Sequence, residues 1–321
     1  MTTKISVIGL GIMGRRMLDN LVVHPEFEPV AVWDPSEEAQ AKTRAEFPAV
    51  PQVGSAEAAI AAADAVYLAC PPAPRKAYAL SASASEQGKG VFLEKPLGVD
   101  IEESRDLVAK LAAAGTRSAV NFTQAAGRAL TEVKRAFDAG EMGAIKGIDI
   151  VVTYPAWPRA WQVEADWLRF RAEGGYTREV ISHFVFLSER LLGRTKIVSA
   201  HASYPSDPAL CETLVLARLE NEAGVPVNIL GSVGGVQPDR QEVTVTAEKM
   251  SYRVAEFFQL SKSDGGPWEQ AIEPPSDHRR ETLQRQLTEF AKCLRGEAHV
   301  LATADDALSV QEKIEGILAS E

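Results

Sequence analysis

The feature that most constrains the fold is a cluster of three glycines near the start of the sequence, in the run Gly9-Leu10-Gly11-Ile12-Met13-Gly14. A short apolar run, 5–8, precedes the cluster, and apolar residues recur at helical spacing over 12–22. These patterns predict a strand, a tight turn and a helix. A second predicted strand, 29–33, ends at Asp34, twenty residues after the last glycine. This order and this spacing are typical of the β-α-β unit that binds a dinucleotide.

The positions of the glycine run have separate physical roles in such a site. Gly9 permits the tight turn, Gly11 lets the pyrophosphate approach the backbone, and Gly14 lets the helix pack closely on the strand. The N–H groups of Ile12 and Met13 begin the helix, where unpaired donors and a partial positive charge favour phosphate. The run therefore predicts a phosphate-binding turn.

Asp34 bears on which dinucleotide binds. A carboxylate at this place accepts both ribose hydroxyls of NAD, whereas the additional phosphate of NADP would meet like charge. No arginine or lysine occurs in the next residues, 35–38. The sequence therefore predicts NAD in preference to NADP. The alternative is a glycine-rich β-α turn in which Asp34 only caps a helix.

The first third of the chain continues to alternate strand and helix patterns. Apolar runs of strand length occupy 65–69, 91–93 and 118–122. A helix is predicted after Asp100, with Glu103 three residues later as in a capping box. Alternation of this kind predicts right-handed crossovers and a doubly wound parallel sheet.

The remaining two-thirds of the chain have a different pattern, with hairpin signals such as Asn221-Glu222-Ala223-Gly224. We therefore expect an α/β protein with an N-terminal Rossmann domain, 1–121, and a C-terminal α+β domain with an open, mostly antiparallel sheet, 122–321. A helix at about 304–320 is expected in the second domain, with the option of packing back on the first. The predicted strands of the second domain are 145–154, 195–204, 213–220, 225–231, 242–247 and 250–258.

A lysine follows the predicted strand 91–93, in Glu94-Lys95-Pro96. Ligands of open parallel sheets bind beyond the carboxyl ends of the strands, so Lys95 is expected in the same crevice as the nicotinamide. There its amine can hydrogen-bond a substrate hydroxyl and assist proton transfer. On these residues alone, a solvated surface lysine is the alternative.

Glu94-Lys95-Pro96, downstream of a dinucleotide fingerprint, resembles the motif of the Gfo/Idh/MocA family, which includes glucose-fructose oxidoreductase and inositol dehydrogenase. The resemblance extends to the segments 138–143, 167–169, 174–176 and 303–307. It implies a Rossmann domain, a second domain with an open, mostly antiparallel sheet, and hydride transfer between NAD(P) and a sugar, polyol or sugar acid. It also implies that Glu94 and Lys95 lie at the cofactor.

The family's second motif is matched by Glu179-Val180-Ile181-Ser182-His183. At positions i and i+4 of a helix, Glu179 and His183 lie on one face, so a carboxylate and an imidazole can address one small ligand. The resemblance implies that His183 exchanges the proton of the substrate hydroxyl, that Glu179 is its acidic partner, and that Lys95 acts with them. Without the resemblance, a surface Glu-His pair beside a core stripe is the alternative.

Three departures from the family pattern accompany these motifs. Glu179 is one methylene longer than the usual aspartate, and Arg178 stands where the family more often has an uncharged residue. Cys70-Pro71-Pro72-Ala73-Pro74-Arg75 occupies the place of a common Thr-Pro-Asn-x-x-His. Cys70 and Pro71 are therefore expected at the cofactor edge near the nicotinamide, and Arg75 is expected to face an anionic group of the substrate.

A group of aromatic and basic residues follows the predicted strand 145–154. Trp157, Trp161 and Trp167 fall within eleven residues, close to Arg169. Aromatic faces pack on sugar C–H surfaces, and guanidinium groups bind hydroxyls or carboxylates. The same loop could equally be held to its own domain by buried indoles. The predicted substrate contacts are Lys95, Asn121, Trp161, Trp167, Arg169, Arg178, Glu179 and His183.

Composition and cysteine spacing bear on whether the protein binds nucleic acid or metal and on whether it is secreted or spans a membrane. The chain has 44 acidic and 34 basic residues and a net charge of -10, which disfavours a nucleic-acid partner. Cys70, Cys211 and Cys293 match neither a disulfide framework nor a metal site, so no metal is predicted and a reducing, cytoplasmic setting is expected. No signal peptide or membrane span is predicted. The family resemblance implies a homodimer or homotetramer.

Two alternatives stand beside the predicted dehydrogenase. A non-catalytic NAD-binding regulator on the same scaffold fits the fingerprint, although loss of Lys95 or His183 would have favoured it and both are present. A β-hydroxyacid dehydrogenase matches the opening glycines and Met17, but that family expects an all-helical second domain. The strands predicted after residue 145 argue against it.

Overall fold

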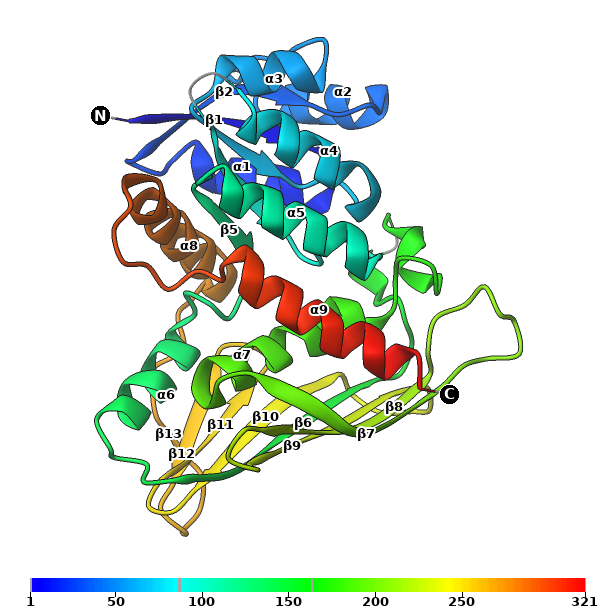
Figure 1. Cartoon of the computed structure of the whole chain (residues 1–321), viewed down its shortest axis with the longest axis vertical. Coiled ribbons are helices and arrows are strands. Elements are labelled where there is room, and N and C mark those ends of the chain that lie inside the picture. Colours follow the sequence, from blue (N-terminus) through cyan, green and yellow to red (C-terminus); the bar gives the residue numbers. More distant parts are fainter. Residues whose placement is uncertain (1, 86–87, 163, 321) are drawn as a thin grey trace. The chain divides into compact units, whose positions relative to one another are not determined.

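A computed structural model describes residues 2–85, 88–162 and 164–320 of the protein. The chain forms two compact units (Figure 1). The first comprises Met1–Phe122 and Arg279–Leu308, and the second comprises Thr123–His278 and Ser309–Glu321. The segment Arg279–Leu308, which the sequence placed in the second domain, thus belongs to the first unit.

The first unit contains a sheet of parallel strands. They are β1 (Thr3–Ile8), β2 (Phe27–Trp33), β3 (Ala65–Leu68), β4 (Gly90–Glu94) and β5 (Ser118–Asn121). Their spatial order is β2-β1-β3-β4-β5. Every residue of β3 and β4 is buried, as expected where helices cover both faces of a parallel sheet. The predicted doubly wound sheet is confirmed.

Helices of the first unit pack around this sheet. They are α1 (Ile12–Leu21), α2 (Glu37–Glu46), α3 (Ala56–Ala62), α4 (Pro72–Ser83), α5 (Ile101–Ala113) and α8 (His278–Arg295). Asp100 caps α5 by accepting a hydrogen bond from the N–H of Glu103 at 2.8 Å, as its spacing predicts. Phe290 of α8 stacks on Phe92 of β4 with 4.7 Å between ring centroids. The late segment therefore completes the core of the first unit.

The second unit contains a larger sheet. Its strands are β6 (Ile145–Tyr154), β7 (Thr195–Ser203), β8 (Leu214–Asn221), β9 (Pro226–Val233), β10 (Arg240–Ala247), β11 (Ser251–Ala255), β12 (Gln259–Ser263) and β13 (Glu269–Gln270). Their order is β13-β12-β11-β10-β6-β9-β8-β7, in which β6 and β9 are parallel and the other neighbours antiparallel. The predicted sheet is confirmed, and this domain is not the all-helical one of a β-hydroxyacid dehydrogenase. The short polar strands β12 and β13, of which β13 forms the edge of the sheet, were not predicted, because they lack an apolar alternation.

Helices lie along one face of the second sheet (Figure 1). They are α6 (Arg128–Asp138), α7 (Ser182–Leu192) and the greater part of α9 (Ala304–Leu318). Almost every residue of α7 is buried, as in a helix enclosed on all sides. The other face of the sheet leaves Val198, Leu216 and Leu230 between 40% and 50% exposed. Leu216 and Leu230 are direct cross-strand partners on β8 and β9.

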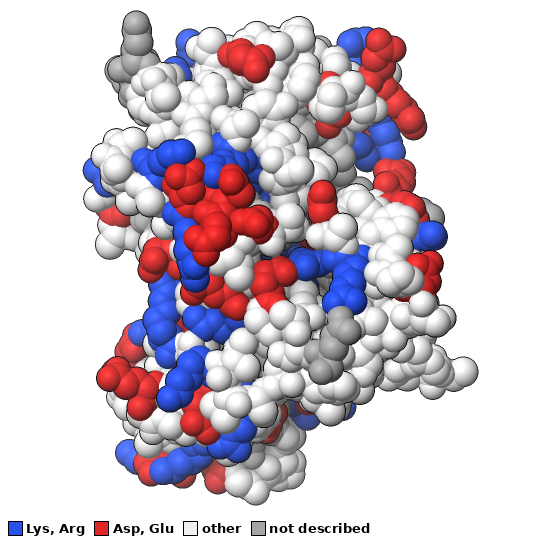
Figure 2. Space-filling view, turned by 45° about the vertical axis from the view of Figure 1, so that its right-hand side comes forward, with Lys and Arg blue, Asp and Glu red and all other residues white. Residues whose placement is uncertain are grey.

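No helix within the described ranges is long and apolar enough to cross a membrane. On the face drawn in Figure 2, basic and acidic side chains are interspersed rather than gathered by sign. Independently of this view, the amine of Lys76 pairs with both Glu103 and Asp106, so this basic side chain lies among acidic ones. The surface in this view therefore offers no broad basic patch among the described residues.

Candidate active site

The turn between β1 and α1 requires glycine at two positions for different reasons. Gly9 has φ of +97°, which side chains rarely adopt, and a Cβ there would lie 2.5 Å from the backbone nitrogen of Cys70. Gly14 approaches the turn itself, since a Cβ on Gly14 would lie 1.8 Å from the carbonyl oxygen of Gly9. The predicted roles of these glycines thus have a direct steric basis.

Gly11 differs, because among the described residues no heavy atom lies within 4 Å of a Cβ built on it. Gly11 is the N-cap of α1, and no side chain there caps the helix. The first N–H groups of a helix need acceptors from outside the helix, and its N-terminus favours negative charge. Open space at Gly11 and an uncapped N-terminus at Ile12 and Met13 fit the pyrophosphate of a dinucleotide.

Asp34 is held beside this turn at the end of β2. Its Oδ2 accepts a hydrogen bond from the N–H of Leu10 at 2.6 Å, and its Oδ1 accepts one from the N–H of Ser36 at 2.8 Å. Each carboxylate oxygen has a second lone pair, so both can still accept a hydrogen bond from a hydroxyl. Asp34 therefore fits the ribose of a dinucleotide while it also holds the N–H of Ser36, the residue that caps α2.

Lys95 and the glycine turn leave the first sheet at the same edge. In the register of the sheet, Ile8, the last residue of β1, is the partner of Leu68 on β3, and Leu68 is the partner of Leu93 on β4. Because these strands are parallel, their carboxyl ends lie together, and Lys95 follows the end of β4 directly. Lys95 is half-buried and forms a cis peptide with the next proline. The structure thus brings the dinucleotide turn and Lys95 to one side of the first unit.

Glu94 turns into the core although it belongs to the same motif as Lys95. Its Oε1 accepts hydrogen bonds from the Tyr67 hydroxyl and from Nδ2 of Asn121, the second at 2.7 Å. Burial raises the pKa of Glu94, and burial and the adjacent carboxylate raise the pKa of Tyr67. Asn121, expected to touch substrate, is buried in this cluster, and its Oδ1 has no partner among the described residues. The cluster joins the ends of β3, β4 and β5.

Arg75 lies in the first turn of α4 and is only 3% exposed. Its Nη1 donates to the carbonyl oxygens of Glu94, at 2.7 Å, and of Pro96, and its Nη2 donates to the carbonyl oxygen of Cys70 at 2.5 Å. The expectation that Arg75 faces an anionic substrate group is wrong, because its guanidinium binds backbone carbonyls inside the first unit. In the same loop Cys70 is buried, whereas Pro71 is exposed.

Glu179 and His183 belong to the second unit, on two joined helical segments. The segment η3 (Thr177–Ile181) is a π-helix that leads directly into α7, where the spacing had predicted an ordinary α-helix. Turns of this wider kind occur frequently at functional sites. Glu179 is half-buried and His183 is buried. The His183 ring meets Phe257 edge-on, with 5.6 Å between ring centroids.

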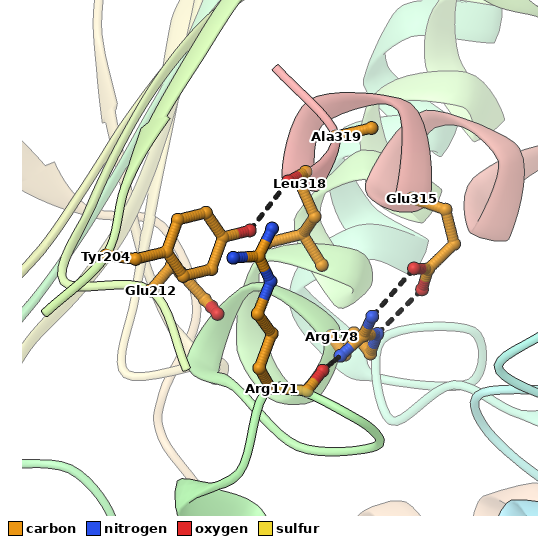
Figure 3. Close-up of a pocket in the computed structure, with 7 residues that line it drawn as sticks. All are labelled: Arg171, Arg178, Tyr204, Glu212, Glu315, Leu318 and Ala319. Carbon is orange, nitrogen blue, oxygen red and sulfur yellow. Dashed lines mark hydrogen bonds and ion pairs between the residues drawn. The ribbon is translucent and has the colours of Figure 1, made fainter. Parts of the chain in front are cut away.

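Arg178 lies on the same π-helix, but its guanidinium binds groups of the second unit (Figure 3). Nε and Nη2 donate to the two carboxylate oxygens of Glu315, each at 2.7 Å. Nη1 donates to the carbonyl oxygens of Arg171 and Gly174, each at 2.8 Å. Glu315 belongs to α9, so the ion pair joins the π-helix to the last helix. Arg178, expected from the sequence to touch substrate, is bound here by protein groups instead.

The same ion pair lines a small cavity of about 200 Å³ (Figure 3). The Arg171 guanidinium lies 3.7 Å from the centroid of the Tyr204 ring, and the Tyr204 hydroxyl donates to the carbonyl oxygen of Leu318 at 2.6 Å. Glu212 accepts the N–H of Thr177 at 2.8 Å, and burial raises the pKa of this carboxyl. The groups around the cavity thus bind one another and support the start of η3.

The aromatic loop after β6 is partly fastened to its own unit. Trp157 donates from Nε1 to the carbonyl oxygen of Leu168 at 2.9 Å. The Arg159 guanidinium lies 5.1 Å from the centroid of Tyr154 and 4.8 Å from that of Trp161. Trp161 keeps 46% of its surface exposed. Trp157 therefore anchors the loop, and Trp161 remains accessible beside a cation.

Two further predicted contacts of this loop lie on the short 3₁₀ helix η2 (Asp166–Arg169). Trp167 is half-buried, and Arg169 is exposed. Arg169 pairs with Asp166 at 3.5 Å, and its guanidinium lies 4.9 Å from the centroid of Phe170. These contacts are local and exposed, so a ligand could displace them at little cost.

The described residues form neither a metal-binding group nor a cysteine suited to act as a nucleophile. No group of three or more His, Cys, Asp or Glu side chains there is arranged to hold a metal ion. Cys70, Cys211 and Cys293 are buried thiols, and burial raises the pKa of each. A thiol with a raised pKa is a poor nucleophile at neutral pH. The cysteines therefore contribute packing.

Two family profiles match this chain in succession. The profile described as "Oxidoreductase family, NAD-binding Rossmann fold" matches residues 3–122, and the profile of the GFO/IDH/MocA C-terminal domain matches residues 130–253. The chain belongs to the Gfo/Idh/MocA oxidoreductase family. The resemblance stated from Glu94-Lys95-Pro96 and the glycine run is thereby confirmed.

Relatives of this family member are distant in sequence and close in fold. The dTDP-3,4-didehydro-2,6-dideoxy-alpha-D-glucose 3-reductase of Streptomyces violaceoruber is 29% identical over 202 residues, which are 60% of this chain and 56% of that protein. The match thus spans little more than half of the curated relative. UDP-N-acetylglucosamine 3-dehydrogenase from Acidithiobacillus ferrooxidans has a TM-score of 0.81 at 18% identity, covering 100% of this chain and 98% of that one. Scyllo-inositol dehydrogenase from Lactobacillus casei has a TM-score of 0.80 at 18% identity, covering 99% of this chain and 96% of that one.

Sequence reasoning missed several residues that support the motifs of this Gfo/Idh/MocA chain. Tyr67 binds Glu94, and its phenol in an otherwise apolar strand was a signal that could have been used. Glu212 and Glu315 hold the π-helix through partners far away in the sequence. No local pattern marks those two acids, because their partners are set by tertiary packing.

Proposed function

We propose that the protein is an NAD-dependent oxidoreductase that transfers a hydride between the nicotinamide and a CH–OH carbon of a sugar, polyol or sugar acid. The observation that carries the proposal is the common edge of the parallel sheet, where the glycine turn follows β1 and Lys95 follows β4, on either side of β3. Nucleotides bind outside this edge in open α/β sheets. A substrate beside the nicotinamide would then be within reach of Lys95.

The cofactor would be held by the groups of the first unit that fit it. The open space at Gly11 and the N–H groups at the start of α1 would receive the pyrophosphate, and Asp34 would accept the ribose hydroxyls. The nicotinamide, when bound, supplies or accepts the hydride. Cys70 and Pro71, in the loop after the neighbouring strand β3, would border it.

The protein's own residues would handle the proton. In the oxidative direction the C–H bond of the carbinol carbon breaks as a hydride, the O–H bond breaks as a proton, and a C=O bond forms. Lys95 would donate a hydrogen bond to the substrate oxygen, and His183 would take the hydroxyl proton. Glu179, four residues before His183, would act as its acidic partner. The reverse reaction uses the same groups in the opposite order.

A sugar-like substrate is supported by two independent facts. The names of the relatives given above include a deoxyhexose, an N-acetylglucosamine and an inositol. In this chain Trp161 presents an exposed indole next to the Arg159 guanidinium, a combination suited to C–H faces and hydroxyl groups. Trp167 and Arg169 would extend the same substrate side.

The preference for NAD over NADP rests on Asp34. Its carboxylate is fixed by two backbone N–H groups, so it cannot easily turn away from a ribose 2′-phosphate. The first turn of α2 adds the acids Glu37 and Glu38. Like charge at this place would weaken NADP binding.

We also propose that the protein forms a homodimer or a homotetramer. The face of the second sheet opposite its helices exposes Val198, Leu216 and Leu230, and exposed apolar groups of this kind favour association. We likewise propose a cytoplasmic location, since Cys70, Cys211 and Cys293 are free thiols.

The test is NADH formation against a panel of sugars, inositols, sugar acids and amino-sugar derivatives, together with fluorescence titration of NADH and NADPH. We expect turnover on at least one member and tighter binding of NADH than of NADPH. Tight NADH binding without turnover on any member would contradict catalysis and favour a non-catalytic NAD-binding regulator. Equal or tighter binding of NADPH would contradict the role of Asp34.

A further inference from the structure

Arg75 connects two loops at the carboxyl edge of the first sheet. One loop follows β3 and contains Cys70, and the other follows β4 and contains Lys95. The loops start next to each other because β3 and β4 are parallel neighbours in register. Arg75 reaches both from the first turn of α4, which begins directly after the Cys70 loop.

The guanidinium holds the backbone on both sides of Lys95. Nη1 donates to the carbonyl oxygen of Glu94, the residue before Lys95, and to that of Pro96, the residue after it. Nη2 donates to the carbonyl oxygen of Cys70 in the other loop. Three carbonyl groups in two loops are therefore fixed by one planar side chain.

Arginine is suited to this task and other cations are not. Its guanidinium presents five donors in a rigid fork and stays charged, whereas a lysine ammonium is a single point and a neutral imidazole has one donor. The charge is not isolated, because Arg75 acts to lower the pKa of the buried Glu94 carboxyl, although burial raises it by more.

We propose that Arg75 is a positioning residue for Lys95. By fixing the carbonyls before and after Lys95 against the Cys70 loop, Arg75 sets the direction in which the Lys95 amine meets the substrate oxygen. This deepens the proposed function and rests on it, since Lys95 acts on substrate only there. A displacement of 1 Å at a reacting group can lower the rate about 100-fold. Loosening the loop that carries Lys95 would therefore mainly lower kcat.

The first test is a double-mutant cycle of Arg75→Lys with Lys95→Ala, measured as kcat. Arg75→Lys should lower kcat at least about tenfold when Lys95 is present and less than about twofold in the Lys95→Ala background. Lys76→Met, at the adjacent half-buried residue of α4 whose amine pairs with Glu103 and Asp106 instead, is the matched control and should leave kcat unchanged. An equal loss in both backgrounds would overturn the proposal, because Arg75 would then act independently of Lys95.

The second test needs no substrate and thus separates this proposal from the proposed function. Hydrogen exchange of the peptide 94–98 should accelerate at least about tenfold in Arg75→Lys, with little change in 65–68 and 90–93. Arg75→His supplies a second variant and should also accelerate exchange over 94–98, because a neutral imidazole has one donor and cannot hold three carbonyl groups. Unchanged exchange over 94–98, or an equal rise over all three segments, would overturn the positioning role. Faster exchange over 94–98 alone, in a protein without turnover, would support the positioning of the loop and contradict only the proposed function.

Discussion

Asp34 and Leu10 are joined by a 2.6 Å hydrogen bond from the Leu10 N–H to Oδ2 of the carboxylate. The bond ties the acid at the end of β2 to the glycine turn after β1. The ribose acceptor and the phosphate turn are therefore parts of one rigid arrangement. A change at Asp34 should consequently affect both the affinity for the dinucleotide and the choice between its two forms.

Asp34→Ala should weaken NADH binding about 10- to 100-fold, because hydrogen bonds to a charged group are worth about 1.5–3 kcal/mol. NADPH binding should fall less or rise, since the like charge is removed. Fluorescence titration with NADH and with NADPH measures the two affinities and their ratio. Asp138→Ala, an exposed acid of α6 in the second unit, is the control and should change neither affinity. An unaltered NADH-to-NADPH ratio in Asp34→Ala would speak against the proposed contact.

Gly14→Ala should destabilise the first unit and abolish dinucleotide binding. The new Cβ would lie 1.8 Å from the carbonyl oxygen of Gly9, which is backbone and cannot swing aside. Overpacking of this kind costs about 3 kcal/mol or more at the severe end. Gly54→Ala is the control, because no described heavy atom lies within 4 Å of its Cβ position. Urea unfolding and NADH titration of both variants measure the difference, and equal behaviour would contradict the steric argument.

His183→Asn should lower kcat about 100- to 10,000-fold, the usual range for loss of a general acid or base. NADH affinity should remain within about threefold, because the cofactor is proposed to bind the first unit. His201→Asn, on an exposed position of β7, is the matched control and should keep wild-type turnover. Wild-type kcat in His183→Asn would remove this residue from the proposed proton transfer.

The buried carboxyl of Glu94 gives a pH prediction. Its pKa is raised by burial in the folded protein, so above its unfolded value the folded state holds a proton that the unfolded state has released. That contribution to stability is complete below the unfolded pKa and is lost as the pH rises through the folded pKa. Glu94→Gln keeps an acceptor for Tyr67 and Asn121 but carries no charge.

The free energy of unfolding of Glu94→Gln, relative to wild type, should therefore rise with pH above about 4.5, by at most about 1.4 kcal/mol per pH unit. Urea unfolding between pH 5 and pH 8 measures it. Glu38→Gln, an exposed acid of α2, should show no such trend. A difference that stays flat or falls with pH would show that Glu94 is ionised in the fold.

The sequence predicted those parts of the fold that local patterns determine. Strand and helix alternation predicted the parallel sheet, and the turn at Asn221 predicted the β8–β9 hairpin, where the Asn221 side chain accepts the N–H of Val225 at 2.8 Å. The place of α8 in the first unit was not predicted, because the stacking of Phe290 on Phe92 joins residues almost two hundred positions apart. Local periodicity contains no information on such a pairing.

The candidate site shows the same division. The glycine turn and the place of Lys95 follow from short motifs whose geometry is local. The orientations of Arg75 and Arg178 do not follow from a local motif, because each guanidinium binds acceptors that only the tertiary structure brings near it. A cation beside a motif in the sequence suggests a ligand contact, yet a buried arginine first satisfies backbone carbonyls and carboxylates that would otherwise lack partners.

Arg178→Met should reveal the structural role of this arginine. Removing it leaves the Glu315 carboxylate and the carbonyls of Arg171 and Gly174 without their donor, and breaking a mostly buried ion pair on one side costs about 3–5 kcal/mol. Arg169→Met, an exposed neighbour, should change stability by less than about 0.5 kcal/mol. Thermal and urea unfolding measure both.

A second substitution separates this role from a substrate contact. Adding Glu315→Gln to Arg178→Met removes the uncompensated charge, so part of the lost stability should return. A substrate-binding arginine would behave differently, since its loss would raise KM without affecting unfolding, and Glu315→Gln would restore nothing. Recovery of stability in the double variant therefore distinguishes an ion pair that holds the π-helix to α9 from a direct contact with substrate.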